Sequence, residues 1–327
     1  MPKVIQQDNF IFYKCPLNAK FSFFRHFWEQ LILPLEIKLK NINVLFTAKN
    51  ANILLAPCKT VISIRNMEPL CYKNYKNHWK LNFFSWHRNK LTTLAIKKAD
   101  KIIAVSKFVK EYLEQHYSGL SNKIDVIYNG NPVHKNDSVN IIEKRGPFLL
   151  SASKFVAYAN QFNLIQGYFE AYKRNLNIPP LWFVGGVLDK LYFKKVEKFI
   201  KNNDLTEKVK ILGLVSHEHL IKLYKSSFAF LFPSTLEACP QTLIEAMACG
   251  IPIATSNIPP MTEICDKAAI YFDPFNKNDM AEKIELLLTD YRLRDSLRKL
   301  ALERSKFFDW GQIAIKMIKV FQETCIA

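Results

Sequence analysis

Glycine is scarce in this sequence. Nine glycines occur among the 327 residues, and the first of them is Gly119. A doubly wound α/β domain usually opens with a strand and a glycine-rich turn near its start. Neither is recognisable near the start of this chain, which has no glycine before Gly119. An α/β domain at this end of the sequence is therefore expected to be shortened at its start.

Long apolar runs and paired cysteines are absent as well. No uninterrupted apolar run approaches the ~20 residues that cross a bilayer, and the opening stretch MPKVIQQDNF lacks the apolar core of a signal peptide. We therefore expect a cytoplasmic protein. The seven cysteines stand singly and form no CxxC motif, which favours buried thiols over disulfides or a zinc site.

Acidic residues are few in the first part of the chain. Residues 1–133 contain 20 Lys and Arg against 8 Asp and Glu, a balance of +12, whereas residues 134–327 contain 26 against 21, a balance of +5. A basic half suggests an anionic partner such as a phospholipid surface, a lipid-linked phosphate or nucleic acid. The alternative interpretation is that the positive charge only reflects a lysine-rich proteome and no particular partner. No nucleic-acid-binding motif accompanies it, so we do not expect nucleic acid as a partner.

Short β-branched runs alternate with helical patterns, and the length of the chain favours two domains. Strands are predicted at 43–48, 60–65, 101–106 and 124–132, and, after a polar stretch, at 147–153, 181–186, 208–213, 228–234, 251–256 and 268–272. The pattern predicts an N-terminal Rossmann-like domain (1–133), a linker (134–146), a C-terminal Rossmann-like domain (147–308) and a last helix (309–327) that packs back on the first domain. Ligands of parallel sheets bind at the carboxyl ends of the strands, so the site is expected in the cleft between the domains.

The stretch STLEACPQTLIEAMACG (234–250) follows the apolar strand FAFLF and has the features of a buried helix. Pro240 is expected as the first helical residue and Gly250 as the left-handed stop. The backbone N–H groups at the start of such a helix have no intrahelical partner and can bind a diphosphate. These amides belong to Gln241, Thr242 and Leu243.

Two glutamates bracket this helix start. Glu237 lies in the loop before the helix, and Glu245 lies a little over one turn inside it. In an ordinary helix, Glu237 would cap the start electrostatically and Glu245 would lie on a face exposed to water. The neighbours of Glu245 are apolar, however, and a buried carboxylate is costly without a partner. Two acceptor side chains beside an anion site suit a ligand that combines hydroxyls with phosphate, such as a nucleotide sugar.

The stretch from Pro233 to Pro274, PSTLEACPQTLIEAMACGIPIATSNIPPMTEICDKAAIYFDP, resembles the C-terminal signature of family 4 retaining glycosyltransferases, which have the GT-B fold. Glu237 and Glu245 match the E-x7-E motif of that family, and Glu263 matches its later glutamate. ADKIIAVSKFVKEYL, KIDVIYNGNP and KVKILGLVSHEHLIKLYKSS agree with the family in the same order. The resemblance spans about residues 22 to 310.

The resemblance implies transfer of a sugar from a nucleotide-diphosphate donor to a glycan or lipid-linked acceptor, without a metal or other cofactor. Glu237 would contact the donor sugar, Glu245 the ribose, the amides of 241–243 the diphosphate, and Gly213 the base pocket. The leading hypothesis is a hexosyltransferase-type enzyme of surface polysaccharide or lipopolysaccharide-type biosynthesis. The alternative is a catalytically impaired family remnant that binds sugar nucleotides or a membrane within a glycan assembly complex.

The sequence departs from the family pattern at three places. Lys154 stands where the family has an arginine for the diphosphate, and Ala159 stands where it has a lysine, so a base such as Lys190 would have to compensate. Arg65 and Asn66 replace a histidine that faces the donor sugar, and they are candidates for the acceptor or donor-sugar side. The third departure is the missing N-terminal strand and glycine-rich loop.

The segment FSFFRHFWEQLILPLEIKLK (21–40) combines aromatic and aliphatic residues with basic ones. A basic amphipathic helix of this kind can lie in a membrane interface. The favoured interpretation is a helix that packs on the sheet of its own domain, with Pro34 breaking any long helix. An electrostatic attraction of the basic domain to the inner face of an anionic membrane remains a second expectation.

Overall fold

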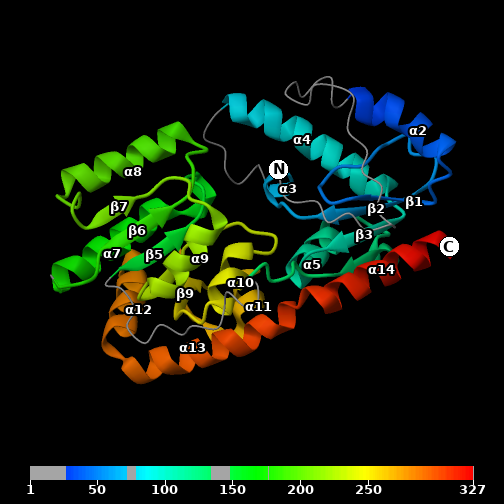
Figure 1. Ribbon diagram of the computed structural model, residues 1–327. Coiled ribbons are helices and arrows are strands. Elements are labelled where there is room, and N and C mark those ends of the chain that lie inside the picture. The colour runs from blue at the N-terminus through cyan, green and yellow to red at the C-terminus, as the bar shows by residue number, and fades with distance from the viewer. Residues whose placement is uncertain (1–26, 72–78, 134–147, 176, 327) are drawn as a thin grey trace.

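The computed structural model describes residues 27–71, 79–133, 148–175 and 177–326, which form two lobes (Figure 1). We call 27–133 the N-lobe and 148–308 the C-lobe. Residues 1–26 and the expected linker at 134–146 lie outside the described residues, and with them the expected shortening at the start of the chain. The fold is GT-B, as the sequence predicted: each lobe contains a parallel sheet covered by helices.

The N-lobe sheet consists of four parallel strands in the order β1-β2-β3-β4. They are β1 (Val44–Thr47), β2 (Lys59–Ile64), β3 (Lys101–Ala104) and β4 (Ile124–Val126). Its helices are α2 (Leu33–Leu39), which follows a π-helical turn (Trp28–Ile32), α3 (Glu68–Cys71), α4 (Trp79–Lys98) and α5 (Lys107–His116). A 3-10 turn (Ser121–Lys123) leads into β4.

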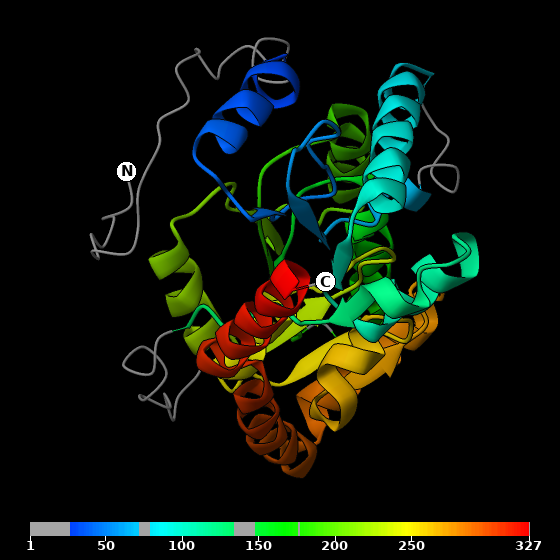
Figure 2. The ribbon, with the colours of Figure 1, turned by 90° about the vertical axis from the view of Figure 1, so that its right-hand side faces the viewer.

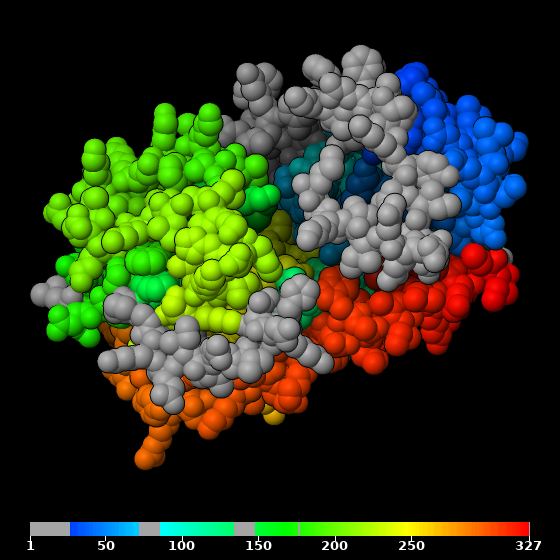
Figure 3. Space-filling model, in the orientation of Figure 1, coloured from blue at the N-terminus to red at the C-terminus, as the bar shows by residue number. Residues whose placement is uncertain are grey.

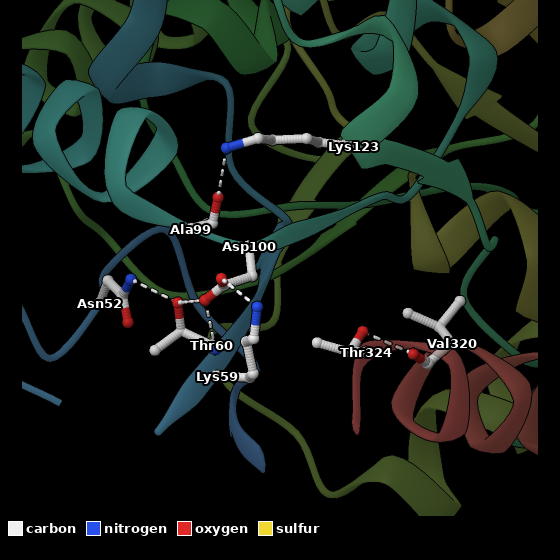
Figure 4. Close-up of polar contacts among 8 residues, drawn as sticks. All are labelled: Asn52, Lys59, Thr60, Ala99, Asp100, Lys123, Val320 and Thr324. Carbon is white, nitrogen blue, oxygen red and sulfur yellow. Dashed lines mark hydrogen bonds and ion pairs between the residues drawn. The ribbon is translucent and has the colours of Figure 1, made fainter. Parts of the chain in front are cut away.

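Asp100 fixes the start of the N-lobe strands (Figure 4). Its Oδ2 accepts hydrogen bonds from Thr60 N at 2.8 Å and Thr60 Oγ1 at 3.2 Å, and its other oxygen pairs with Lys59 at 3.6 Å. Asn52 Nδ2 donates to the same hydroxyl at 3.3 Å. The amino ends of β2 and β3 are thereby held in register, so their carboxyl ends emerge together on the cleft side.

The C-lobe sheet has six parallel strands in the order β10-β9-β8-β5-β6-β7. They are β5 (Leu149–Ala152), β6 (Leu181–Val184), β7 (Val209–Ile211), β8 (Ala229–Phe232), β9 (Ile253–Ser256) and β10 (Ile270–Phe272). The helices are α7 (Gln161–Arg174), α8 (Lys190–Asn202), α9 (His217–Ser226), α10 (Gln241–Ala248), α11 (Met261–Cys265), α12 (Lys277–Thr289) and α13 (Tyr291–Ser305). Three 3-10 turns lie at Ala157–Ala159, Asp266–Ala268 and Lys306–Phe308. The predicted strands are present, with ends that differ by a few residues except at 124–132, where β4 already ends at Val126.

The last helix, α14 (Trp310–Ile326), leaves the C-lobe and runs back along the N-lobe (Figure 1, Figure 2). Its Ile313 and Val320 are buried against Val61 of β2 and Ile103 of β3. Its Phe321 packs on Phe46 with ring centroids 5.1 Å apart. The chain therefore crosses between the lobes twice, and α14 ties the end of the chain to the first sheet.

The segment 27–40 differs from the expected helix in two respects. Pro34 does not interrupt it, because the π-helical turn leads directly into α2 with the proline near its first position. Of the α2 side chains only Pro34 and Ile37 are buried, whereas Leu35 is 61% and Leu39 82% exposed. Any packing of α2 on its own domain therefore buries only these two of its side chains. Within the described residues, none of the helices combines the length and hydropathy that a membrane span requires.

Candidate active site

The loop between β8 and α10 lies at the carboxyl end of the C-lobe sheet. All four residues of β8 are buried, so the polar residues that follow are delivered to the sheet edge. The carbonyl of Tyr158 accepts hydrogen bonds from Thr235 N at 2.7 Å, Thr235 Oγ1 at 3.0 Å and Ser234 Oγ at 3.3 Å. The loop is therefore fixed to the 3-10 turn at Ala157–Ala159, which leads into α7.

Glu237 is the carboxylate at the centre of this loop. Ser234 Oγ donates to Glu237 Oε1 at 2.9 Å. Burial raises the pKa of Glu237 to about 7, and the serine hydrogen bond opposes this rise only in part. Near neutral pH the side chain is thus poised between the acid and the carboxylate, and it can exchange hydrogen bonds with hydroxyl groups in either form.

Helix α10 begins one residue later than expected. Pro240 is the N-cap and has φ −68° and ψ 102°, whereas Gly250 has the predicted positive φ of 58°. The amide of Leu243 is paired, because it donates to Pro240 O at 3.1 Å. The expectation of three unpaired amides is therefore wrong for Leu243. Among the described residues no acceptor is found for the amides of Gln241 and Thr242.

Glu245 is buried, with 6% of its surface exposed, and faces α9. His217, the first residue of α9, lies with Nε2 3.3 Å from Glu245 Oε1. Burial raises the pKa of Glu245, and His217 and Tyr224 act against this rise. The loop that leads into α9 begins at Gly213, whose φ is 72° and whose carbonyl accepts from Gly185 N at 2.8 Å. The loop that starts at Gly213 thus leads to His217, which contacts Glu245.

Arg65 follows β2, and both its backbone and its guanidinium are held by asparagines of the N-lobe. Its backbone N–H donates to Asn50 Oδ1 at 2.8 Å, and Nη2 of its guanidinium donates to Asn129 Oδ1 at 2.7 Å. Asn129, in the loop after β4, in turn donates through Nδ2 to the carbonyl of Cys239 at 3.1 Å. An N-lobe cation is therefore connected through one asparagine to the C-lobe loop that carries Glu237.

A pocket of about 430 Å³ lies between the lobes, and Figure 3 shows the surface hollowed between them. Five residues singled out from the sequence line it together with Ala159; they are Arg65, Lys154, Glu237, Gln241 and Thr242. Leu243, Glu245 and Gly213 do not line it, and neither does Lys190, which is exposed at the start of α8. Asn66 lines a neighbouring pocket of about 410 Å³ in the N-lobe, and Arg65 borders both pockets.

Sequence reasoning missed several residues of this site. Asn129 and Tyr158 line the pocket, and His217 contacts Glu245. The Asn-Gly pair at 129–130 falls in the stretch predicted as a strand (124–132), although such a pair at a strand end could have marked a cleft residue. Nothing in the local pattern around Tyr158 or His217 signals their contacts, because the partners lie 77 and 28 positions away.

The family follows from the comparison with known proteins. The family described as Glycosyl transferases group 1 matches residues 133–304, and the description Glycosyltransferase Family 4 matches residues 5–134. The chain belongs to the glycosyl transferases group 1 family, in agreement with the resemblance of the E-x7-E region.

Curated relatives are similar over part of their length. The O-antigen chain mannosyltransferase RfbU of Salmonella typhimurium is 29% identical over 60% of this chain and 53% of its own length. An N-acetylgalactosamine-N,N'-diacetylbacillosaminyl-diphospho-undecaprenol 4-alpha-N-acetylgalactosaminyltransferase of Campylobacter jejuni is 28% identical over 74% of this chain and 65% of its own length. The chain thus spans between about half and two thirds of these relatives.

Solved structures share the fold. A glycosyltransferase from Rickettsia africae superposes with a TM-score of 0.73 at 21% identity, over 95% of this chain and 84% of that one. Anabaena HepE in complex with UDP and glucose superposes with a TM-score of 0.70 at 17% identity, over 90% of this chain and 82% of that one. At these identities the similarity concerns the fold.

Proposed function

We propose that this protein is a retaining glycosyltransferase that moves a hexose from a nucleotide-diphosphate donor to a hydroxyl of a glycan or lipid-linked acceptor. The observation that carries the proposal is the interlobe pocket, in which Glu237, the start of α10 and two cations meet. Hydroxyl-binding and phosphate-binding groups on one pocket wall suit a sugar joined to a diphosphate. The family membership and the names of the relatives support the same reaction class.

The proposed donor orientation follows from the positions of the groups. The diphosphate lies at the amides of Gln241 and Thr242 beside Lys154, and the sugar lies at Glu237. The ribose and base extend toward Glu245 and Gly213, outside the pocket itself. In this orientation Glu237 holds sugar hydroxyls and stabilises positive charge near the anomeric carbon.

The proposed reaction is a displacement at the anomeric carbon. The bond from this carbon to the β-phosphate oxygen breaks, and a bond to the acceptor oxygen forms on the same face. The acceptor proton passes to the departing phosphate, and a nucleoside diphosphate leaves. Charge on the leaving group is stabilised by fixed dipoles and cations of the chain, so we propose that no metal is required.

We infer that the acceptor belongs to surface polysaccharide or lipopolysaccharide-type biosynthesis and that the protein works in the cytoplasm at an anionic membrane surface. The Campylobacter relative, whose name includes a diphospho-undecaprenol, supports a lipid-linked acceptor. The exposed leucines of α2 next to Lys38 and Lys40 support contact with a membrane.

The proposal is tested with purified protein and a panel of UDP-, GDP- and other sugar nucleotides. Turnover with one donor is expected, and Glu237→Ala should reduce it by about 100-fold or more, since it removes a preorganised group at the reacting centre. The matched control is Glu282→Ala, which removes an exposed carboxylate on α12.

The same panel separates the alternative, a catalytically impaired remnant, for which Ala159 is the supporting observation. Binding of a nucleotide without turnover, lost on Glu245→Ala, would favour the remnant. A protein that binds no nucleotide at all would contradict both proposals.

A further inference from the structure

Among the residues that the structure describes, the C-lobe side of the interlobe pocket carries one cation for a diphosphate. Lys154 lines the pocket and is exposed, whereas Ala159, also in the lining, is 3% exposed and brings no charge. A departing nucleoside diphosphate gains negative charge on its β-phosphate as the bond to the sugar breaks. One lysine and a helix start leave much of that charge without a counter-charge.

Among the described lining residues, Arg65 is the second cation of this pocket, and it comes from the N-lobe. Its guanidinium hydrogen-bonds to the neutral amide of Asn129, and among the described residues no carboxylate lies within ion-pair distance of it. The cations that share the neighbouring N-lobe pocket differ in this respect. Lys49 pairs with Glu29 at 3.0 Å and Arg88 pairs with Glu68 at 3.0 Å. The charge of Arg65 is therefore available to a ligand.

Hydrogen bonds fix both the backbone and the guanidinium of Arg65. Asn50 Oδ1 holds the backbone at Arg65 N at 2.8 Å and Asn66 N at 3.1 Å. Asn129 holds the guanidinium and is itself bonded to Cys239 O, one residue before the N-cap of α10. This arrangement places Arg65 in the lining of the same pocket as Gln241 and Thr242, whose amides are free at the start of α10. A planar fork held in place loses little entropy when it binds phosphate oxygens.

We propose that Arg65 binds the β-phosphate of the donor and supplies, from the opposite lobe, the cation that Ala159 cannot supply. The inference rests on the proposed function. As the bond from the anomeric carbon to the β-phosphate oxygen breaks, the electron pair goes to that oxygen, and Arg65 and Lys154 stabilise it from the two sides of the cleft. The acceptor proton then neutralises the same phosphate. Because one phosphate contacts both lobes, donor binding also holds the pocket closed.

The decisive measurement compares nucleotide affinities of the full-length protein by titration calorimetry. UDP and GDP are titrated against UMP and GMP, which lack the β-phosphate. Arg65→Ala should weaken binding of the diphosphate by about 10- to 100-fold, the range for a lost charged hydrogen bond, and leave the monophosphate unchanged. Arg65→Lys should lie between, because it keeps the charge and loses the fork.

A rescue variant distinguishes the charge from other effects of the side chain. Adding Ala159→Lys to Arg65→Ala restores a pocket cation on the C-lobe, and it should recover part of the diphosphate affinity and of kcat. Arg292→Ala, an exposed arginine of α13, is the matched control and should match the wild type. Thermal melting verifies that each variant is folded, which is expected because Arg65 is exposed.

Three outcomes would overturn the inference or its basis. Unchanged diphosphate affinity and donor KM in Arg65→Ala, with a raised acceptor KM, would assign Arg65 to the neighbouring N-lobe pocket instead. Unchanged parameters throughout would remove Arg65 from the reaction. If the wild type binds none of the four nucleotides, the proposed function itself fails. If the wild type and Arg65→Ala bind them equally well, only the inference about Arg65 fails.

Discussion

At the scale of single residues, Glu237 has a proposed role in donor binding, and its ionised form lowers the stability of the folded protein. Glu237 is half-buried and lines the interlobe pocket, and the partial loss of water around its carboxyl group raises its pKa to about 7. The folded chain then keeps a proton on Glu237 over a range of pH in which the unfolded chain has lost it. Raising the pH through this range favours the unfolded state, because the ionised side chain is poorly solvated in the folded protein.

We therefore expect Glu237→Gln to stabilise the protein at pH 8 and to have little effect at pH 4.5. A pKa raised from 4.5 to about 7 corresponds to about 3 kcal/mol in the free energy of unfolding, and access of the side chain to the pocket lowers this to about 2 kcal/mol. Denaturant unfolding of the wild type and of Glu237→Gln at the two pH values measures the difference in their free energies of unfolding. The contributions of the other titrating groups cancel in this difference. An equal difference at both values would contradict the assignment.

At the scale of elements, helices α10 and α2 differ in burial and in the surface that they present. Helix α10 is buried almost throughout and presents its start to the pocket. Helix α2 is its opposite, since Leu35 and Leu39 are exposed one turn apart and Lys38 and Lys40 lie beside them. Exposed leucines next to lysines match the chemistry of an anionic lipid surface, where the leucines enter the interface and the lysines remain at the headgroups.

Replacing Leu35 and Leu39 by serine should reduce binding to vesicles of phosphatidylglycerol and phosphatidylcholine by at least about 10-fold, since each leucine that leaves water contributes about 1.5 kcal/mol or more. Cosedimentation at low and physiological salt measures the binding, and neutral vesicles should bind less at both. Leu300→Ser, an exposed leucine of α13, is the matched control. Equal binding of the double variant and the wild type would argue against membrane contact through α2.

At the scale of the whole molecule, Glu263 of α11 joins the lobes. Its carboxylate accepts hydrogen bonds from Lys107 N at 2.7 Å, Phe108 N at 3.0 Å and Tyr128 OH at 2.7 Å, all of which belong to the N-lobe. The first two are amides at the start of α5, where a negative charge is also favoured by the helix dipole. Ser106 Oγ adds a bond of 2.6 Å to Ala238 O nearby.

Glu263→Ala should weaken the coupling between the lobes by about 2 to 4 kcal/mol, because it leaves charged hydrogen bonds unmade. Calorimetric melting is expected to change from a single transition toward two, and hydrogen exchange should increase at the start of α5. Glu282→Ala serves as the control for loss of one exposed carboxylate. A variant that melts in one transition at the wild-type temperature would show that α14 and the apolar contacts suffice to hold the lobes together.

The alternating strands and helices were readable from the sequence because each depends on neighbours in the chain. Continuous apolar runs such as FAFLF become central parallel strands wherever helices cover both faces, and the stop at Gly250 depends on one residue that tolerates a positive φ. The E-x7-E region likewise identified the family from local order alone. The roles of Glu237 and Glu245 toward a donor stay predictions.

The tertiary structure decided which of these residues meet. Arg65 and Asn129 lie 64 positions apart and Gln241 and Gly130 lie 111 apart, and no local pattern encodes such contacts. The sequence placed a cation and two glutamates near strand ends, whereas only the tertiary structure showed that Arg65 and Lys154 line one pocket and that Glu245 does not line it. The reason is physical: secondary structure follows from the periodicity of nearby side chains, but a site formed between two lobes depends on how their packed surfaces fit.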